Sequence, residues 1–146
     1  MQDNINFDTS EQVEKAFYLA FQNNDIEMMM SIWCEDSETV CIHPGGPRLE
    51  GLNNIRASWE QIFNYDRELT FEINHKKIIV EDNIALHHVI ESIFLNNELQ
   101  SEIIATNIYL KTTNGWKMVL HHASPELPPN FNQAYIDDLD EIQTIH

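Results

Sequence analysis

The segment IALHHVIESIFLNNELQSEIIATNIYLKT, residues 84–112, decides the fold because it reads as two long strands joined by a turn at Asn96-Asn97. A second turn signal, Thr113-Asn114-Gly115, follows directly, and GWKMVLHHASP (115–125) reads as another strand. Asparagine and glycine at such short connections are typical of hairpins. The spacing therefore predicts a meander of long antiparallel strands.

Upstream of this meander the chain carries one more segment with a hydrophobic period of two, and before it lie segments with the period of a helix. Residues 67–82 alternate apolar and polar side chains and predict one more strand, which ends at a turn over 81–83. Residues 10–23, 26–33 and 51–66 carry apolar stripes at helical spacing, and Asp25 is a suitable cap for the second helix. Between the last two, SETVCIH (37–43) reads as a strand that Pro44 ends.

Helices followed by a run of strands indicate an α+β fold with helices on one face of an antiparallel sheet. Because long strands twist and curl, we expect a curved antiparallel sheet wrapped around three N-terminal helices, with a cone-shaped cavity between the layers. Residues 1–127 would form one domain. The acidic tail 128–146 begins after the sheet with Pro128-Pro129 and forms either a helix or a loose segment.

Composition narrows the class of partner. The chain has 146 residues, 42% of them hydrophobic, with 8 Lys and Arg against 24 Asp and Glu, a formal charge of −16. Such acidity argues against nucleic acid and against an anionic membrane surface, because both need cationic side chains. Cys34 and Cys41 form no disulfide framework, and the N-terminus lacks the features of a signal peptide. We expect a cytoplasmic protein.

Residues 16–63 and 105–125 carry a family resemblance. The Asp25–Trp33 segment, the His43-Pro44-Gly45-Gly46 turn, Trp59 and the final strand with its two histidines together resemble the bacterial SnoaL-like proteins of the nuclear transport factor 2-like superfamily. The resemblance implies a cone-shaped cavity and a homodimer through the open sheet face. Members of this superfamily include isomerases, dehydratases, cyclases, hydrolases and association domains, so fold alone does not give function.

The sequence departs from two of these relatives. Where the association domain of calcium/calmodulin-dependent kinase II has a pocket arginine, Asn107 stands here. The pocket aspartate of ketosteroid isomerase and the polyketide cyclases has no matching motif in this chain.

Three residues are candidate acid–base catalysts. His43 ends the first expected strand, where its ring either faces the cone as a general base or bonds a loop carbonyl. His122 shares an alternating face with Trp116 and Met118, which places it inside and His121 on the solvent or dimer side. Glu91 is the one carboxylate within 84–95 and 103–111; the favoured alternative is an exposed or dimer-facing side chain.

Four further residues are candidate ligand contacts. Trp33 and Trp59 lie on covering helices, where Trp33 suits core packing and Trp59 could stack on an apolar ligand. Asn107 and Tyr109 share one strand face, and Asn107 needs partners if buried, either His122, His43 or the ligand. The seven histidines predict no metal site, because the adjacent His-His pairs diverge on their strands.

Three functions remain open at this stage. The first is a protein that binds a small, largely apolar molecule in its cavity. The second is a lyase, isomerase or hydrolase that uses a pocket histidine or carboxylate and no organic cofactor. The third is a dimeric association module. An enzyme predicts titratable groups that converge on a cavity open to solvent, whereas an association module predicts a filled cavity and an exposed apolar sheet face.

Overall fold

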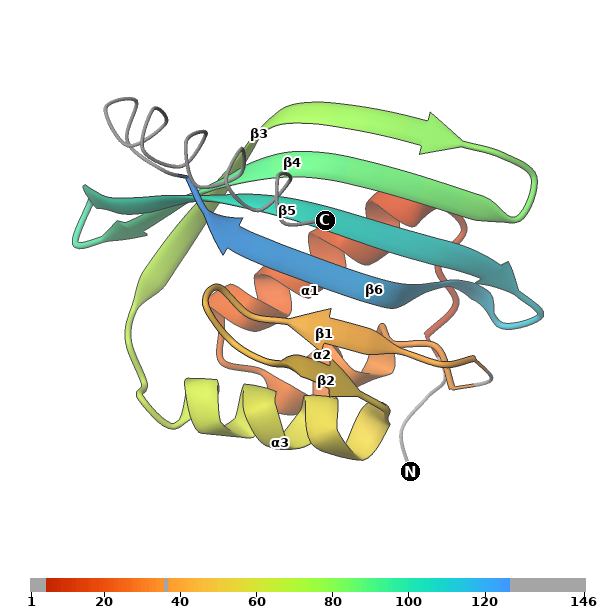
Figure 1. Ribbon diagram of the computed structural model, residues 1–146, viewed down its shortest axis with the longest axis horizontal. Helices are drawn as coiled ribbons and strands as arrows, with labels where there is room; N and C mark the ends of the chain where they lie inside the picture. Colours follow the sequence, from red (N-terminus) through yellow and green to blue (C-terminus); the bar gives the residue numbers. More distant parts are fainter. Residues whose placement is uncertain (1–4, 36, 127–146) are drawn as a thin grey trace, which may run out of the picture.

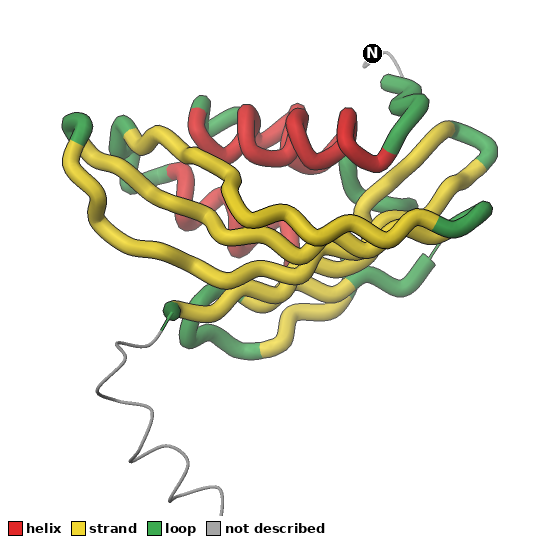
Figure 2. The backbone as a smooth tube through the Cα atoms, turned by 90° about the horizontal axis from the view of Figure 1, so that it is seen from above, coloured by secondary structure: helices red, strands yellow, loops and turns green. Residues whose placement is uncertain are grey.

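The computed structural model describes residues 5–35 and 37–126, in which helices pack on one side of a curved sheet (Figures 1 and 2). The expected tail, 128–146, lies outside the described residues. Among the described residues, no helix is both long and apolar enough to cross a membrane. The elements in chain order are α1 (Ser10–Gln22), α2 (Ile26–Ser31), β1 (Val40–Ile42), β2 (Arg48–Glu50), α3 (Leu52–Phe63), β3 (Leu69–Val80), β4 (Ile84–Leu95), β5 (Glu98–Thr112) and β6 (Gly115–Pro125).

The three expected helices are confirmed, and local chemistry explains where two of them begin. The Thr9 hydroxyl accepts a hydrogen bond from the Gln12 N–H at 3.2 Å and caps α1. The Asp25 carboxylate accepts from the Met28 N–H at 3.1 Å and caps α2. α3 instead follows Gly51, whose φ of 84° favours glycine.

The four-stranded meander is also confirmed, since β3, β4, β5 and β6 pair antiparallel in sequence order. The complete sheet has the order β2-β1-β6-β5-β4-β3, with β1 parallel to β6. It is therefore mixed rather than wholly antiparallel. The sequence did not predict β2, because a three-residue strand is too short to show alternation. The Pro-Gly-Gly-Pro segment is the turn that joins β1 to β2 in an antiparallel hairpin.

A β-bulge between β5 and β6 changes which side chains of β6 face the helices. Ile108 pairs with Leu120 but Tyr109 pairs with Met118, so Val119 is an extra residue. Alternation restarts after Val119, and His121 is buried while His122 is exposed. The prediction that His122 faces inward was wrong, because an unbroken period of two was assumed along this strand.

A second bulge lies in β3. Asn74 pairs with Ile90 and Lys77 with His88, so His75 and Lys76 together oppose a single residue of β4. His75 has a φ of 51°, in the left-handed region. The bulge places Lys76 on the face toward the helical layer. In a regular strand Lys76 would lie on the opposite face from Phe71 and Ile73.

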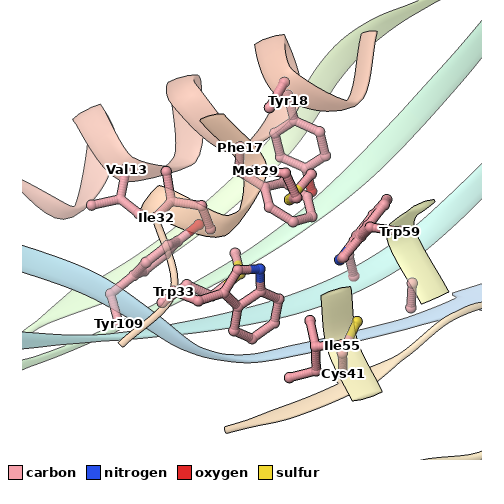
Figure 3. Packing of buried hydrophobic residues seen from close by; sticks show 14 of the residues in the cluster. Val13, Phe17, Tyr18, Met29, Ile32, Trp33, Cys41, Ile55, Trp59 and Tyr109 are labelled. Atoms are coloured by element: carbon pink, nitrogen blue, oxygen red, sulfur yellow. The ribbon is translucent and has the colours of Figure 1, made fainter. Parts of the chain in front are cut away.

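The core lies between the helices and the inner sheet face (Figure 3). Trp59 of α3 packs edge-on against Phe17 and Phe21 of α1, with ring centroids 5.5 and 4.8 Å apart. Phe17 also lies 4.8 Å from the ring of His121. Side chains therefore fill the middle of the cone, and open space lies at its edge.

Candidate groove between helix α1 and strand β3

A groove of about 490 Å³ runs between α1 and β3. Its apolar wall includes Leu19 of α1 with Phe71 and Ile73 of β3. Glu14 and Tyr18, one helical turn apart on α1, and Lys76 of the β3 bulge give it polar groups. The groove thus combines apolar surface with a few polar side chains at one place, as ligand sites commonly do.

Glu14 is the buried carboxylate of this groove, with a side chain only 3% exposed. Its Oε2 lies 2.8 Å from Nδ1 of His87 and accepts a hydrogen bond from the Tyr109 hydroxyl at 3.3 Å. Its Oε1 has no hydrogen-bond partner among the described residues. Lys76 Nζ lies 3.4 Å from Oε1 and pairs with it by charge. His87 and Tyr109 therefore hold one oxygen, and the other lies beside Lys76 where α1 borders the groove.

His87 joins Glu14 to the start of α1. Its Nε2 lies 2.8 Å from the Ser10 hydroxyl, and its ring is fully buried. With the proton on Nδ1, His87 donates to Glu14 and accepts from Ser10. This chain of three side chains fixes α1 against β4 and satisfies polar groups that would otherwise be buried without partners.

A second chain of hydrogen bonds starts at Tyr18. The Tyr18 hydroxyl donates to Glu91 Oε2 at 2.6 Å and accepts from the Asn107 amide at 3.1 Å. The Asn107 carbonyl oxygen lies 2.6 Å from Nδ1 of His121, which donates to it. The chain links four elements, and Tyr18 is the member that reaches the groove.

Burial shifts the titration of these groups in opposite directions. It raises the pKa of Glu91 to about 7, with the charge of Glu14 adding to the rise and the Tyr18 bond opposing it. Burial lowers the pKa of His121 to about 3. It also raises the pKa of Tyr18 and Tyr109 well above the usual tyrosine range. Near neutral pH, Glu91 titrates, His121 is neutral and both tyrosines keep their protons.

Three of the residues singled out from the sequence fall in this network: Glu91, Asn107 and Tyr109. The favoured reading of Glu91 as an exposed side chain was wrong, because it is 2% exposed on the inner face. Asn107 does bond a histidine, but its partners are His121 and Tyr18 rather than the expected His122 or His43.

The other predicted site residues lie elsewhere. His43 lies beside α3, with Nε2 2.9 Å from the Ser58 hydroxyl and its ring 4.7 Å from that of Trp59, and burial lowers its pKa. Trp33 and Trp59 are buried in the core, and neither indole N–H has a hydrogen-bond partner among the described residues. None of these residues lines the groove.

Sequence reasoning missed Glu14, Tyr18, His87 and Lys76. Glu14 lies on the same helical stripe as Val13 and Phe17, about one turn before Phe17. An acidic residue on a buried stripe is the signal that could have found it. No comparable signal exists for Lys76, because its direction depends on the bulge.

The described residues contain no group of three or more His, Cys, Asp or Glu side chains placed to hold a metal ion.

The fold is shared with solved structures. A protein from Thiobacillus denitrificans, provisionally named a calcium/calmodulin-dependent protein kinase type II association domain, is 34% identical over 84% of this chain and 99% of its own, with a TM-score of 0.76. A Streptomyces avermitilis protein, provisionally named a dehydratase of the NTF2-like family, is 29% identical over 81% of this chain and 94% of its own, with a TM-score of 0.74.

One further protein and one family model also match this chain. The F-box protein SKIP8 of Arabidopsis thaliana is 24% identical over 112 residues, 77% of this chain, and the chain spans 47% of that relative's length. The model of the SnoaL-like domain matches residues 11–128. This chain belongs to the SnoaL-like domain family, within the NTF2-like fold.

Proposed function

We propose that this chain binds a small, largely apolar molecule in the groove between α1 and β3 and catalyses a proton transfer on it, as a lyase or isomerase does, without an organic cofactor. One observation supports this above all. Glu14 is a buried carboxylate at the groove whose Oε1 lies 3.4 Å from Lys76 Nζ and has no hydrogen bond among the described residues. A base in such a position can accept a proton from a bound molecule.

Tyr18 supplies the complementary acid. It lies four residues after Glu14, so both side chains lie on the same face of α1. Its hydroxyl donates to the ionised Glu91, so Tyr18 can give its proton to a bound molecule when Glu91, with a pKa of about 7, is protonated and passes that proton to the Tyr18 oxygen. Glu14 lies at the groove and Glu91 lies behind Tyr18. Two carboxylates in such different surroundings can act separately as base and acid.

The apolar wall fits the substrate expected from the sequence. Leu19, Phe71 and Ile73 offer surface for an apolar body, and a volume near 490 Å³ is within the usual range for small-molecule sites. The Streptomyces avermitilis protein gives independent support for a lyase, because a dehydratase is one. Of the catalytic candidates named from the sequence, this proposal keeps Glu91 and leaves out His43 and His122.

The test is deuterium exchange, which requires no knowledge of the product. A mixture of small alcohols, ketones and hydroxy acids is incubated with the protein in D₂O, and mass spectrometry detects any compound that gains deuterium at carbon. Glu14→Gln should slow the exchange at least about 100-fold, the usual contribution of a general base. Glu72→Gln, at an exposed β3 carboxylate that does not line the groove, should retain it.

Two results would contradict the proposal. Exchange that survives Glu14→Gln in a variant with a normal melting curve would remove Glu14 as the base. Compounds that bind in the groove and never exchange would make the chain a binding protein without this catalysis.

A second candidate function, association through the outer sheet face, also has a specific observation in its favour. Ile79, Leu86, Ile108, Leu120 and Val40 are direct neighbours in register across five strands on the face opposite the helices. Such a row is suited to a second copy of the chain. The Thiobacillus denitrificans relative, provisionally named as an association domain, agrees with this.

Light scattering after gel filtration tests the association. We expect a dimer for the parent chain and a monomer for Ile108→Glu, because a charge in an apolar interface loses its hydration. Thr70→Glu, at an exposed β3 position outside the row, is the matched control. A monomeric parent would end this second proposal and leave the first unaffected.

A further inference from the structure

We propose that the group of the ligand that meets Glu14 and Lys76 is an uncharged hydroxyl, as in an alcohol, a phenol or an enol, carried on an apolar frame. This inference rests on the proposed function, because it names the class of molecule that the same groove would take. Its basis is the pattern of donors and acceptors that these two side chains present.

Glu14 cannot turn away from the groove. His87 Nδ1 at 2.8 Å and the Tyr109 hydroxyl at 3.3 Å both hold Oε2. His87 is itself held by Ser10 on the other side of its ring. Rotating the carboxylate would break these bonds in a buried place, so Oε1 stays beside Lys76 at the edge of the groove, without a hydrogen bond among the described residues.

Lys76 pairs with Oε1 by charge and does not donate a hydrogen bond to it. Its Nζ lies 3.4 Å from Oε1, but Oε1 remains without a hydrogen bond. The lysine side chain is 44% exposed and comes from the bulge at His75. Lys76 thus stands beside Oε1 as a donor that also faces the groove.

A hydroxyl complements the acceptor of Glu14 and the donor of Lys76. An acceptor and a donor side by side are both satisfied by one hydroxyl, which donates to Glu14 and accepts from Lys76. An ammonium has donors only and would face the like charge of Lys76. A carboxylate has acceptors only and would leave Glu14 Oε1 unsatisfied beside a second negative charge.

The charges along the groove point the same way. Two glutamates, Glu11 and Glu14, and two lysines, Lys15 and Lys76, line it. These charges balance, so the groove has no excess charge with which to favour an ionic ligand. Selectivity then depends on hydrogen bonding to the hydroxyl and on the apolar wall that receives its frame.

A matched series of three probes tests this class. 1-Indanol, 1-aminoindane and indane-1-carboxylate share one frame and differ in the group under test. Each is titrated into the whole chain at neutral pH, with NMR signals of the Leu19 and Ile73 methyl groups as reporters of the groove. We expect 1-indanol to have a Kd at least about tenfold lower than the other two, since each of those leaves one hydrogen bond unmade.

A substitution should then switch the preference. Lys76→Met removes the donor and the like charge, so 1-aminoindane should become the tightest of the three by pairing with Glu14. Lys77→Met, one residue later and directed at the other face, should keep the parent's order. Both positions are exposed, so neither change should prevent folding.

The possible results separate the two proposals. A parent that prefers the amine or the carboxylate overturns the hydroxyl assignment. Equal affinity for all three, with the Leu19 and Ile73 signals shifting, also overturns it but keeps the groove as a binding site. If no probe shifts those signals at any concentration, the groove is not a binding site and the proposed function fails with it.

Discussion

The layer between helices and sheet has two halves of different chemistry. The polar half lies under α1 and consists of Ser10, Glu14, Tyr18, His87, Glu91, Asn107, Tyr109 and His121. The apolar half lies under α2 and α3 and consists of Met29, Ile32, Trp33, Cys41, Ile55, Trp59, Phe63 and Met118 (Figure 3). Both are equally buried, so burial alone does not distinguish them.

The difference shows how one core can serve two purposes. Apolar side chains gain free energy on burial with few demands on geometry. Buried polar groups lose hydration and are tolerated only when each finds a partner. In the polar half, Glu14 Oε1 has no hydrogen bond among the described residues and only the charge of Lys76 beside it, and this is the group that the proposed ligand would use. We expect stability to depend mainly on the apolar half and function on the polar half.

The largest expected effect is in the apolar half. Trp59→Ala removes a fully buried side chain that packs on Phe17, Phe21 and Phe63. The free energy of unfolding should fall by about 3–5 kcal/mol. Urea unfolding followed by circular dichroism measures it. A loss below about 1 kcal/mol would mean that the apolar half is not what stabilises the fold.

The next effect concerns pH and the polar half. The pKa of Glu91 is raised from its ordinary value of 4.5 to about 7, so between these values the folded chain holds a proton that the unfolded chain releases. Its contribution to stability is full below pH 4.5 and is lost as pH rises through 7. The loss should be roughly 3 kcal/mol. Urea midpoints of the parent and Glu91→Gln, compared from pH 4.5 to 7.5, isolate this contribution.

His121 should give the opposite slope. Its pKa is lowered from 6.5 to about 3, so between these values the unfolded chain binds the extra proton. Stability from His121 is full above pH 6.5 and falls as the pH drops. A His121→Gln variant should therefore lose stability relative to the parent at pH 7 more than at pH 5. Parallel slopes for the Glu91 and His121 variants would contradict the assigned hydrogen-bond network.

A smaller effect is expected at Tyr18. Tyr18→Phe keeps the ring but removes the hydroxyl between Glu91 and Asn107, which leaves both with an unmade hydrogen bond. The free energy of unfolding should fall by about 1–3 kcal/mol. Tyr109→Phe, which loses a single bond of 3.3 Å, should cost less in the same urea experiment. The reverse order would show that Tyr109 is the main polar support of this half.

The smallest effect is expected outside both halves. His122 is exposed on the outer sheet face, so His122→Ala should change the free energy of unfolding by no more than about 0.5 kcal/mol. Thermal and urea unfolding measure this at a concentration where association, if present, is saturated. A loss of unfolding free energy comparable with that of His121→Gln would mean that the His122 side chain lies in the interior.

Much of the fold was predictable because its signals are local. Caps at Thr9 and Asp25 and turns at 96–97 and 113–115 set the ends of long elements, and β4, β5 and β6 have the predicted bounds. The β1–β2 hairpin and its parallel contact with β6 were not predictable in this way. They depend on packing between segments far apart in the sequence, for which a short stretch of residues carries no signal.

The candidate site was predictable only in part. Glu91, Asn107 and Tyr109 drew attention as polar residues in apolar strands, and all three are buried in one network. The side of the sheet on which His121 lies, and the direction of Lys76, follow from two bulges that shift the period of two. A bulge reverses the face on which every later residue of the strand lies. An unbroken period of two therefore predicts His122, rather than His121, on the inner face.

The central claim is that the polar half ends at a binding groove, and a crystal structure of the protein soaked with 1-indanol tests it most directly. The account predicts the indane frame against Leu19, Phe71 and Ile73, with its hydroxyl within hydrogen-bond distance of both Glu14 Oε1 and Lys76 Nζ. Density for the probe elsewhere, with only water between Glu14 and Lys76, would contradict it.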